Sequence, residues 1–375
     1  MKKITALVIA LIMALTLGTT ALATSVTEGG EDAAGTSAAH VVALKKSLKL
    51  TDTTTGIALY APEISFQYTL NAEALTADEL GYNTKSGDAG DLNKDYMTNG
   101  KSIEEAGIKV RDGLTETGAP AVSIAAPAIL SFSSTDVLPA EMNTGNEGDN
   151  LIVKMLGINI SAGTVPGIYR FRITESLAEG SKSREEAGVT HNENYAQVRY
   201  LDVYVTYDEA DQLEVSNAVL FRYENGSATK TEGWTSANDP EMYETVDVTV
   251  KKTITGNLAD KNHEFPFSFN VTDPATGSLY SYKDDDAEII AGAAFGTQVN
   301  EAYLSSVLGL ENGSTFTIYG LPKNAAVKST VTVSEKNDTP DTYTYETVPD
   351  FRGRSFEKTV PLVIPLEEYL ATRKQ

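Results

Sequence analysis

The chain of 375 residues contains no cysteine. Disulfide bonds, thiolate metal sites and cysteine nucleophiles are therefore excluded. Its three histidines, His40, His191 and His263, are far apart in the sequence, so a histidine-rich metal centre or a Ser-His-Asp triad would have few residues to draw on. No GxSxG nucleophile motif is present either. We therefore predict a protein that is not an enzyme with turnover, without cofactor or metal.

Basic residues are in the minority. Lysine and arginine together number 30 against 52 aspartates and glutamates, which gives a formal net charge of −22. Nucleic acids and anionic membrane surfaces are bound through basic patches, so we expect neither as a partner. Hydrophobic residues make up 41% and charged residues 22% of the chain, a composition typical of a globular protein. The length is sufficient for two domains.

The N-terminus has the pattern of an export signal. Lys2 and Lys3 precede an apolar run over 4–17, and small residues follow it as far as Ala23. This pattern predicts a signal peptide over 1–23 and an exported, cell-surface protein. A membrane anchor is the alternative, but the apolar run is short for a bilayer span. An exported protein without cysteine needs a source of stability other than disulfides.

The rest of the chain is typical of an all-β protein. Residues 24–40 are small and polar, which predicts a flexible lead. Alternating apolar and polar residues, separated by Gly, Asn, Asp and Pro, then predict strands. These strands are expected at 40–50, 64–70, 169–175, 200–205, 246–252, 265–271, 316–319 and 331–335. Short helices are expected at 72–80, 103–107 and 301–308. The fold class predicted is a pair of tandem immunoglobulin-like β-sandwiches.

The order of these signals repeats along the chain. A lysine-bearing strand, a Phe-rich strand and a strand that ends in glutamate recur after residue 243. We therefore predict a first domain over 41–243 and a second domain over 244–375. The first domain is the larger, with polar insertions at 72–116 and 177–194.

Four charged residues are in phase with the apolar rows of their strands: Lys46, Glu175, Lys252 and Glu335. Because alternate side chains of a strand share one face, each charge is expected on the face toward the core. The alternative is that each lies at a strand end and extends to water. A lone buried charge is costly, so a lysine and a glutamate on one core are expected to meet.

Such a pair has a possible chemistry. Burial favours the neutral amine of lysine and the protonated form of glutamic acid. A neutral amine is a nucleophile, and a protonated acid can donate a proton to an amide. With an Asn carboxamide beside the amine, the products would be an isopeptide bond and ammonia. That bond would stabilise an exported domain as a disulfide does.

Several sequence strings together resemble a known family. They are KKSLKL from Lys45, PGIYRFRITE from Pro166, YLDVYV from Tyr200, YETVDVTVKKTITG from Tyr243, and FTIYGLP with TVTVSE near the end. The chain resembles the major (backbone) pilins of Gram-positive bacteria, which are built from tandem CnaB-like immunoglobulin-type domains. The resemblance implies a structural subunit of a pilus, or fimbrium, on the cell wall, with autocatalytic Lys–Asn isopeptide bonds inside its domains.

The resemblance also implies roles for single residues. In the first domain Lys46 would be the amine donor, Glu175 the catalytic acid and Asn238 the acceptor, although Asp239 to Met242 separate Asn238 from Tyr243. In the second domain Lys252 and Glu335 would be the donor and the acid. No asparagine follows Asn337, so Asp350 is the remaining candidate acceptor there.

In this family a sortase joins subunits through a lysine of one pilin and the C-terminus of the next. Lys230, in the string SATK, resembles the site of that lysine. The expected partners are other copies of the chain and a pilus-specific sortase, with minor pilins and a host surface as further candidates. No LPXTG-like sorting signal is present in the sequence. The alternative function is a surface adhesin or tip pilin that uses the insertion at 72–116 as its contact loop.

Overall fold

The structure is a computed structural model of the chain. It describes residues 27–28, 40–70, 73–85, 100–124, 128–144, 150–191, 196–235, 241–272, 279–284, 290–294, 308–323, 327, 330–335 and 362–365. The predicted signal peptide over 1–23 and the predicted helix at 301–308, except its last residue, lie outside these ranges. No helix in the described ranges is long and apolar enough to cross a membrane.

The first sandwich consists of two facing sheets. In one sheet the central strand β2 (His40–Thr51) lies between β9 (Leu151–Ser161) on one side and β15 (Gly233–Trp234) and β16 (Glu241–Lys251) on the other. Three short strands extend this sheet: β6 (Ala121–Ile124) pairs with β9, β11 (Val189–His191) pairs with β16, and β1 (Thr27–Glu28) pairs with β2. The facing sheet has the order β14 (Ser227–Lys230), β13 (Leu213–Glu224), β12 (Val198–Tyr207), β10 (Gly167–Leu177), β4 (Ile64–Leu70) and β7 (Ile129–Phe132), with β5 (Val110–Asp112) parallel to β10. β3 (Leu59–Tyr60) pairs with β8 (Val137–Leu138), and the short η1 is at Ala140–Met142.

The second sandwich is smaller. One sheet has the order β16, β21 (Thr315–Pro322), β18 (Leu279–Asp284) and β19 (Ile290–Ala294). The other has the order β20 (Leu308–Leu310), β17 (Phe265–Thr272), β22 (Thr330–Glu335) and β23 (Leu362–Pro365). The rings of Phe269 and Phe316, one from each sheet, stack with their centroids 3.9 Å apart. The all-β sandwich fold expected from the alternating strands is therefore confirmed.

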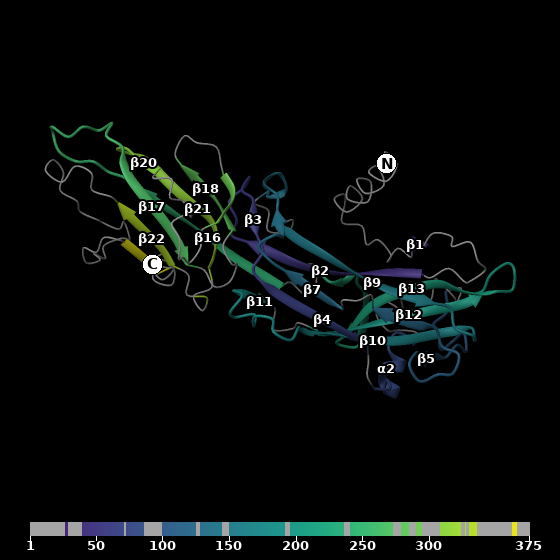
Figure 1. The fold of residues 1–375 in the computed structure, drawn as a ribbon. Coiled ribbons are helices and arrows are strands. Elements are labelled where there is room, and N and C mark those ends of the chain that lie inside the picture. Colours follow the sequence, from purple (N-terminus) through teal and green to yellow (C-terminus); the bar gives the residue numbers. More distant parts are fainter. Residues whose placement is uncertain are drawn as a thin grey trace.

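A single strand belongs to both sandwiches. Glu241 to Glu244 of β16 pair in parallel with β2, and Thr245 to Lys251 pair antiparallel with β21. The hydroxyl of Thr245 also donates a hydrogen bond to the Thr51 carbonyl, 3.1 Å away. The two sandwiches consequently lie end to end, with β16 at their junction (Figure 1). The predicted domain boundary at 243 falls inside this strand.

The cores follow the period-2 rows of the strands. In β2 the residues Val42, Leu44, Leu48 and Leu50 are all buried, and they meet Phe66, Phe171 and Leu201 of the facing sheet. A separate apolar cluster fills the second sandwich and includes Val246, Val248, Phe267, Ile318 and Val333. Burial of these alternate side chains is the main favourable free energy that holds each pair of sheets together.

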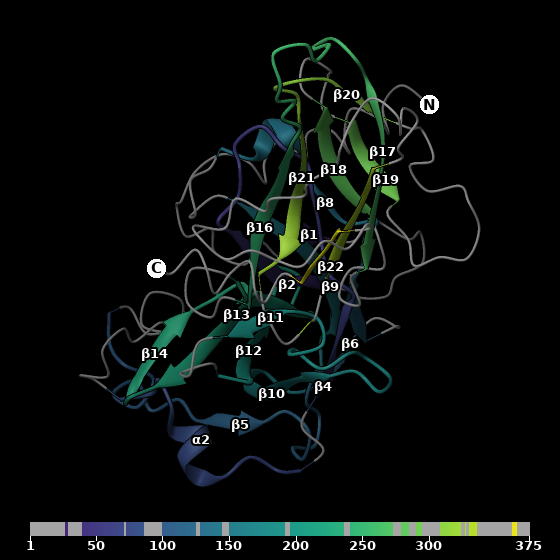
Figure 2. The same cartoon turned by 90° about the vertical axis from the view of Figure 1, so that its left-hand side faces the viewer.

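The described parts of the insertion, 73–85 and 100–116, pack against the facing sheet of the first sandwich. They contain β5, which pairs with β10 at the edge of the sheet, and α2 (Ala77–Gly81), which lies on the side of β10 that faces away from β2 (Figure 2). Arg170 of β10 is fully buried there; its guanidinium forms two hydrogen bonds with Asp202, of 2.7 and 2.8 Å, and one of 2.6 Å with the Glu79 carbonyl. A guanidinium that forms a buried ion pair within the sheet thus also binds the backbone of the insertion.

The predicted strands agree with the structure better than the predicted helices do. Each strand expected between 40 and 335 overlaps an observed strand, and the Asn225-Gly226 turn connects β13 to β14 with φ values of 52° and 75°. The helix expected at 72–80 is restricted to Ala77–Gly81, where Thr76 and Glu79 form a capping box. The helix expected at 103–107 was wrong: this segment forms turns.

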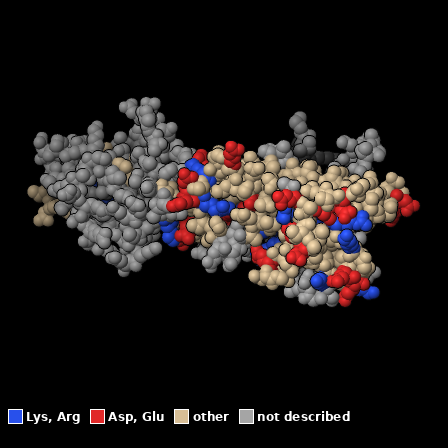
Figure 3. Space-filling model, turned by 90° about the horizontal axis from the view of Figure 1, so that it is seen from below, with Lys and Arg blue, Asp and Glu red and all other residues tan. Residues whose placement is uncertain are grey.

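Charges of both signs alternate over the surface of the first sandwich. In the view of Figure 3, Lys and Arg side chains are interspersed with Asp and Glu side chains over the described part of the chain. Several are paired, as Lys182 is with Glu63 at 3.0 Å. Exposed pairs of this kind contribute little to stability. The energetically important charges are those in the interior.

Candidate functional site

The candidate site is built around Lys46, in the middle of β2. Its neighbours in the same row, Leu44 and Leu48, are core residues, so the alternation carries the lysine into the interior. The side chain of Lys46 is 0% exposed. Its ammonium lies over the Phe66 ring, 4.0 Å from the centroid. The prediction that Lys46 faces the core is confirmed.

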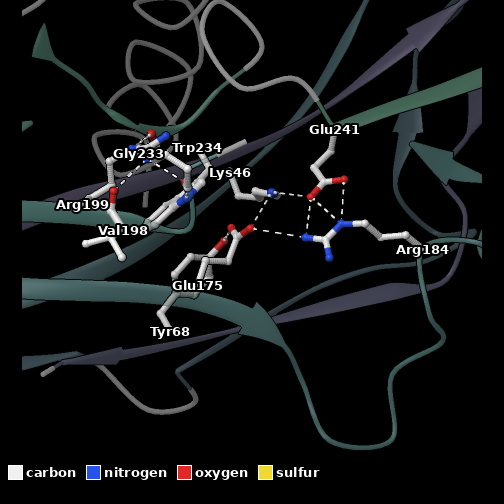
Figure 4. A network of polar contacts seen from close by, with 10 residues as sticks. Lys46, Tyr68, Glu175, Arg184, Val198, Arg199, Gly233, Trp234 and Glu241 are labelled. Atoms are coloured by element: carbon white, nitrogen blue, oxygen red, sulfur yellow. Dashed lines mark hydrogen bonds and ion pairs between the residues drawn. The ribbon is translucent and has the colours of Figure 1, made fainter. Parts of the chain in front are cut away.

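Glu175 meets Lys46 from the facing sheet. It follows Tyr169, Phe171 and Ile173 in the inward row of β10, and its side chain is also 0% exposed. Lys46 Nζ lies 3.0 Å from Glu175 Oε1. The hydroxyl of Tyr68, on the adjacent strand β4, donates a hydrogen bond to Glu175 Oε2 at 2.7 Å. Both oxygens of this carboxyl group are therefore engaged in the core (Figure 4).

Burial governs the protonation of these groups. Removal from water raises the pKa of the Glu175 carboxyl, although the Lys46 ammonium and the Tyr68 hydrogen bond act in the opposite direction. Burial, assisted by the charge of Glu175, also raises the pKa of the Tyr68 phenol well above its ordinary value. The Tyr68 hydroxyl thus stays protonated and serves as a hydrogen-bond donor to Glu175. Glu175 is held closer to its protonated form than a surface glutamate.

A second carboxylate lies at the same amine. Glu241, the first residue of β16, is fully buried, and its Oε1 lies 3.4 Å from Lys46 Nζ. Arg184 binds Glu241 through three hydrogen bonds: Nε to Oε1 at 2.9 Å, Nε to Oε2 at 3.2 Å and Nη2 to Oε1 at 2.8 Å. The same guanidinium lies 3.9 Å from Glu175 Oε1. Figure 4 shows Lys46 between the two carboxylates and Arg184 on their far side.

An aromatic wall closes one side of the site. Trp234 of β15 is fully buried and pairs with Lys46 in the parallel register of β15 and β2. Arg199 stacks over the Trp234 ring at 4.8 Å and donates a hydrogen bond to the Gly233 carbonyl at 3.0 Å. Gly233 has a φ of +136°, and a Cβ there would lie 2.1 Å from the Lys45 carbonyl oxygen. Glycine therefore permits β15 to approach β2 beside the amine.

The predicted acceptor of the first domain lies outside the described residues. Asn238 falls in the segment 236–240, which separates β15 from β16. Described residues on both sides of this segment lie at the site: Trp234 pairs with Lys46, and Glu241 forms an ion pair with it. The structure thus places Lys46 and Glu175 together and does not describe the third member of the predicted set.

The second-domain lysine has different surroundings. Lys252 follows the last residue of β16 and is only partly buried. Its ammonium lies over the Phe265 ring, 3.9 Å from the centroid, and 5.7 Å from that of Phe267. Glu335 is the last residue of β22, where its backbone pairs with Phe267; its side chain is not described. Asp350 lies outside the described residues.

The predicted linkage residue lies on the surface. Lys230 is the last residue of β14, the edge strand of its sheet, and its side chain is exposed. An enzyme could reach such a lysine without unfolding the domain. Its role as a linkage point stays a prediction.

Several residues of the site were missed from the sequence. Tyr68 follows Ile64 and Phe66 in the inward row of β4, so the period-2 rule already indicated its place. Glu241 precedes the buried Tyr243 by two residues, but this alternation is too short to stand out. Arg184 comes from the irregular segment between β10 and β11, for which no sequence period exists.

Comparisons with known proteins give one match. A domain family of unknown function, DUF7601, matches residues 246–359. The match begins next to the point in β16 where pairing changes from β2 to β21, and it ends before β23, so it covers the second sandwich except for that strand. No curated protein and no solved structure matches the chain.

Proposed function

We propose that this chain is a structural subunit of a cell-surface pilus, polymerised by a sortase and stabilised inside its first domain by an isopeptide bond from Lys46 to Asn238. One observation carries the proposal: the amine of Lys46, fully buried in a cysteine-free β-sandwich, is hydrogen-bonded to a buried carboxyl whose pKa is raised by burial. Burial of such a pair costs desolvation free energy that two apolar residues of similar size would not, so stability alone does not account for it.

The reaction balances without a co-reactant. The neutral Lys46 amine attacks the carboxamide carbon of Asn238, and a C–N bond forms to Nζ. Glu175 gives a proton to the carboxamide nitrogen, which leaves as ammonia when its own C–N bond breaks. The proton released from the attacking amine restores Glu175. Tyr68 supports this role because its hydrogen bond keeps the Glu175 carboxyl in place, 3.0 Å from the amine.

The position of Asn238 in the sequence favours it as the acceptor. The segment that contains it lies in the sequence between Thr235 and Glu241. Trp234, just before this stretch, pairs with Lys46, and Glu241 pairs with Leu48, the next inward residue of β2. A short connection with both ends beside one amine keeps its residues at high effective concentration.

Intact mass tests the bond. The folded protein is expected to weigh less than its sequence by one ammonia, and a tryptic digest should contain a Lys46–Asn238 branched peptide. Glu175→Gln should retain the full mass, whereas the matched control Glu232→Gln should lose ammonia as wild type does. Glu232 is a suitable control because it pairs with the neighbouring Lys45 at 2.8 Å outside the core. A full-mass wild-type protein would overturn the crosslink.

Covalent ladders test the subunit role. In cells that express the matching sortase, Lys230→Ala should abolish high-molecular-weight ladders in cell-wall extracts and leave a folded monomer. Lys251→Ala, another exposed strand residue, is the control and should leave the ladders intact. A single monomer band in the wild type, with binding to a host ligand, would instead favour the adhesin.

A further inference from the structure

The site contains one charged pair more than the proposed reaction uses. Lys46 and Glu175 suffice for the proton transfers, yet Glu241 and Arg184 lie at the same place. The side chain of Glu241 is 0% exposed and that of Arg184 is 18% exposed. Two cations and two carboxylates thus form a cluster that is formally neutral.

We propose that Arg184 is a positioning residue for amide formation at Lys46: by binding Glu241 through both of its oxygens, it neutralises a carboxylate that would otherwise hold the lysine in its unreactive, charged form. This inference rests on the crosslink proposed above. It assigns a role to two residues that the sequence did not indicate.

Arg184 acts on Lys46 through the charge of Glu241. An ammonium cannot attack a carboxamide, so the reaction needs the neutral amine. A carboxylate 3.4 Å from Nζ, in a site closed to water, favours the ammonium strongly. Glu241 is such a carboxylate. The three hydrogen bonds from Arg184 compensate its charge, which leaves Lys46 and Glu175 to exchange a single proton between them.

The guanidinium also has the right shape for this task. Its planar fork can bind two carboxylate oxygens at once, which a lysine ammonium cannot do. In the structure Nε and Nη2 face Glu241, while the distance from Nη2 to Glu175 is 3.9 Å. Arg184 therefore binds Glu241 in preference to Glu175, and Glu175 stays available to the amine and to Tyr68.

The other ionisable groups around the cluster are accounted for. Tyr68 on β4 donates its hydroxyl to Glu175, and burial keeps that phenol protonated. Arg199 on β12 is used by backbone carbonyls and by the Trp234 ring. Glu241 is itself one cause of the raised Glu175 pKa. Thus the Arg184–Glu241 pair is the part of the cluster that adjusts the charge at Lys46.

The test is a double-mutant cycle read by mass. The full chain is synthesised by cell-free translation, and loss of ammonia is followed with time for Arg184→Gln, Glu241→Gln and the double variant. Arg184→Gln leaves Glu241 uncompensated, and Glu241→Gln frees Arg184 to bind Glu175. Each single variant should form the bond at least about tenfold more slowly, since one pK unit of interaction is a factor of ten. The double variant, neutral again, should recover most of the wild-type rate.

Two further variants separate positioning from simple stability. Arg172→Gln is the matched control, because Arg172 pairs with Glu79 at 2.9 Å and has a similar exposure of 23%; its rate of ammonia loss should be unchanged. Arg184→Lys retains the charge without the fork and should react faster than Arg184→Gln. If Arg184→Gln fails to fold, the Arg184→Lys and double variants still carry the comparison.

The pH profile gives a readout that a structural role would not move. In Arg184→Gln the site has an extra negative charge, so it retains an additional proton until a higher pH. The acid limb of its rate profile should therefore move to higher pH, and the second substitution Glu241→Gln should move it back.

The outcomes distinguish this inference from the function it rests on. Equal rates and equal pH profiles in Arg184→Gln and wild type, or a double variant slower than both single variants, would overturn the role of Arg184 while leaving the bond in place. A wild-type chain that never loses ammonia would overturn the bond and this role together.

Discussion

The two lysine-bearing strands look alike in sequence but end in different surroundings. Lys46 lies within β2, between the two sheets, with two carboxylates within 3.4 Å of its amine. Lys252 comes just after β16 ends, partly exposed, with its ammonium over the Phe265 ring. The difference shows that an in-phase charge is buried when the strand continues past it. At a strand end the same phase leaves the charge close to water.

The largest expected effect is the difference in stability lost when each of these two lysines is replaced. In the crosslinked wild type Lys46 is an amide, so Lys46→Met removes the bond itself, which contributes about 5 kcal/mol from the entropy of closing a long loop. In a chain without the bond, the same substitution removes the cation between two buried carboxylates, which costs about 3–5 kcal/mol. Lys252→Met should cost at most about 1 kcal/mol, the usual value of an exposed cation–π contact. Denaturant unfolding of the two variants measures both changes.

Limited proteolysis gives a second readout of the same pair. With its bond formed, the first sandwich of the wild type should survive as a resistant core while the second is cut first. Lys46→Met should remove this difference, and Lys252→Met should not. A resistant second sandwich that contains a crosslink at Lys252 would reverse the comparison between the two domains.

A smaller effect tests whether loss of ammonia depends on Lys46 alone or also on the other buried cation of the first domain, Arg170. Arg170→Met breaks the buried pair with Asp202 and leaves that carboxylate alone, which should cost about 3–5 kcal/mol without any change in the ammonia loss. The control is Arg222→Met, because Arg222 pairs with Glu224 at 3.3 Å near the surface and should cost under about 1 kcal/mol. A change of mass in Arg170→Met would mean that the insertion also controls the reaction.

Site residues could be predicted from the sequence where they lie in a regular alternating strand, and not where they lie in an irregular segment. Lys46 and Glu175 lie in long alternating runs, so their burial was predictable. Arg170 and Asp202 lie on the outward face of their strands, where the sequence pattern predicts exposure to solvent. They are buried because the folded insertion, with α2 against β10, covers them. Arg184 reaches Glu241 from a segment without a period, 57 positions away. Contacts made by irregular segments are set by the tertiary fold and leave no local pattern.

The smallest expected effect is a difference in pH dependence between Glu79 and Glu175, two carboxyl groups on opposite faces of one sheet. Burial raises the pKa of Glu79 too, but hydrogen bonds from Thr76, Arg172 and Tyr200 outweigh it, so the Glu79 pKa is lowered. Stability from Glu79 is therefore present above its ordinary pKa and is lost as the pH falls through its lowered value. The Glu175 pKa is raised, so its contribution has the opposite sign and weakens as the pH rises through that raised value.

These signs predict opposite slopes for two conservative variants. Between about pH 3 and 7, the free energy of unfolding of wild type relative to Glu79→Gln should fall on acidification, whereas relative to Glu175→Gln it should rise. An amide at Lys46 would enlarge the second slope, because it removes the ammonium that lowers the Glu175 pKa. Urea titrations at a series of pH values measure both differences. Parallel slopes would show that Glu175 behaves as a carboxylate bound for stability, as Glu79 does, and would take away the proton donor on which the contrast between Lys46 and Lys252 depends.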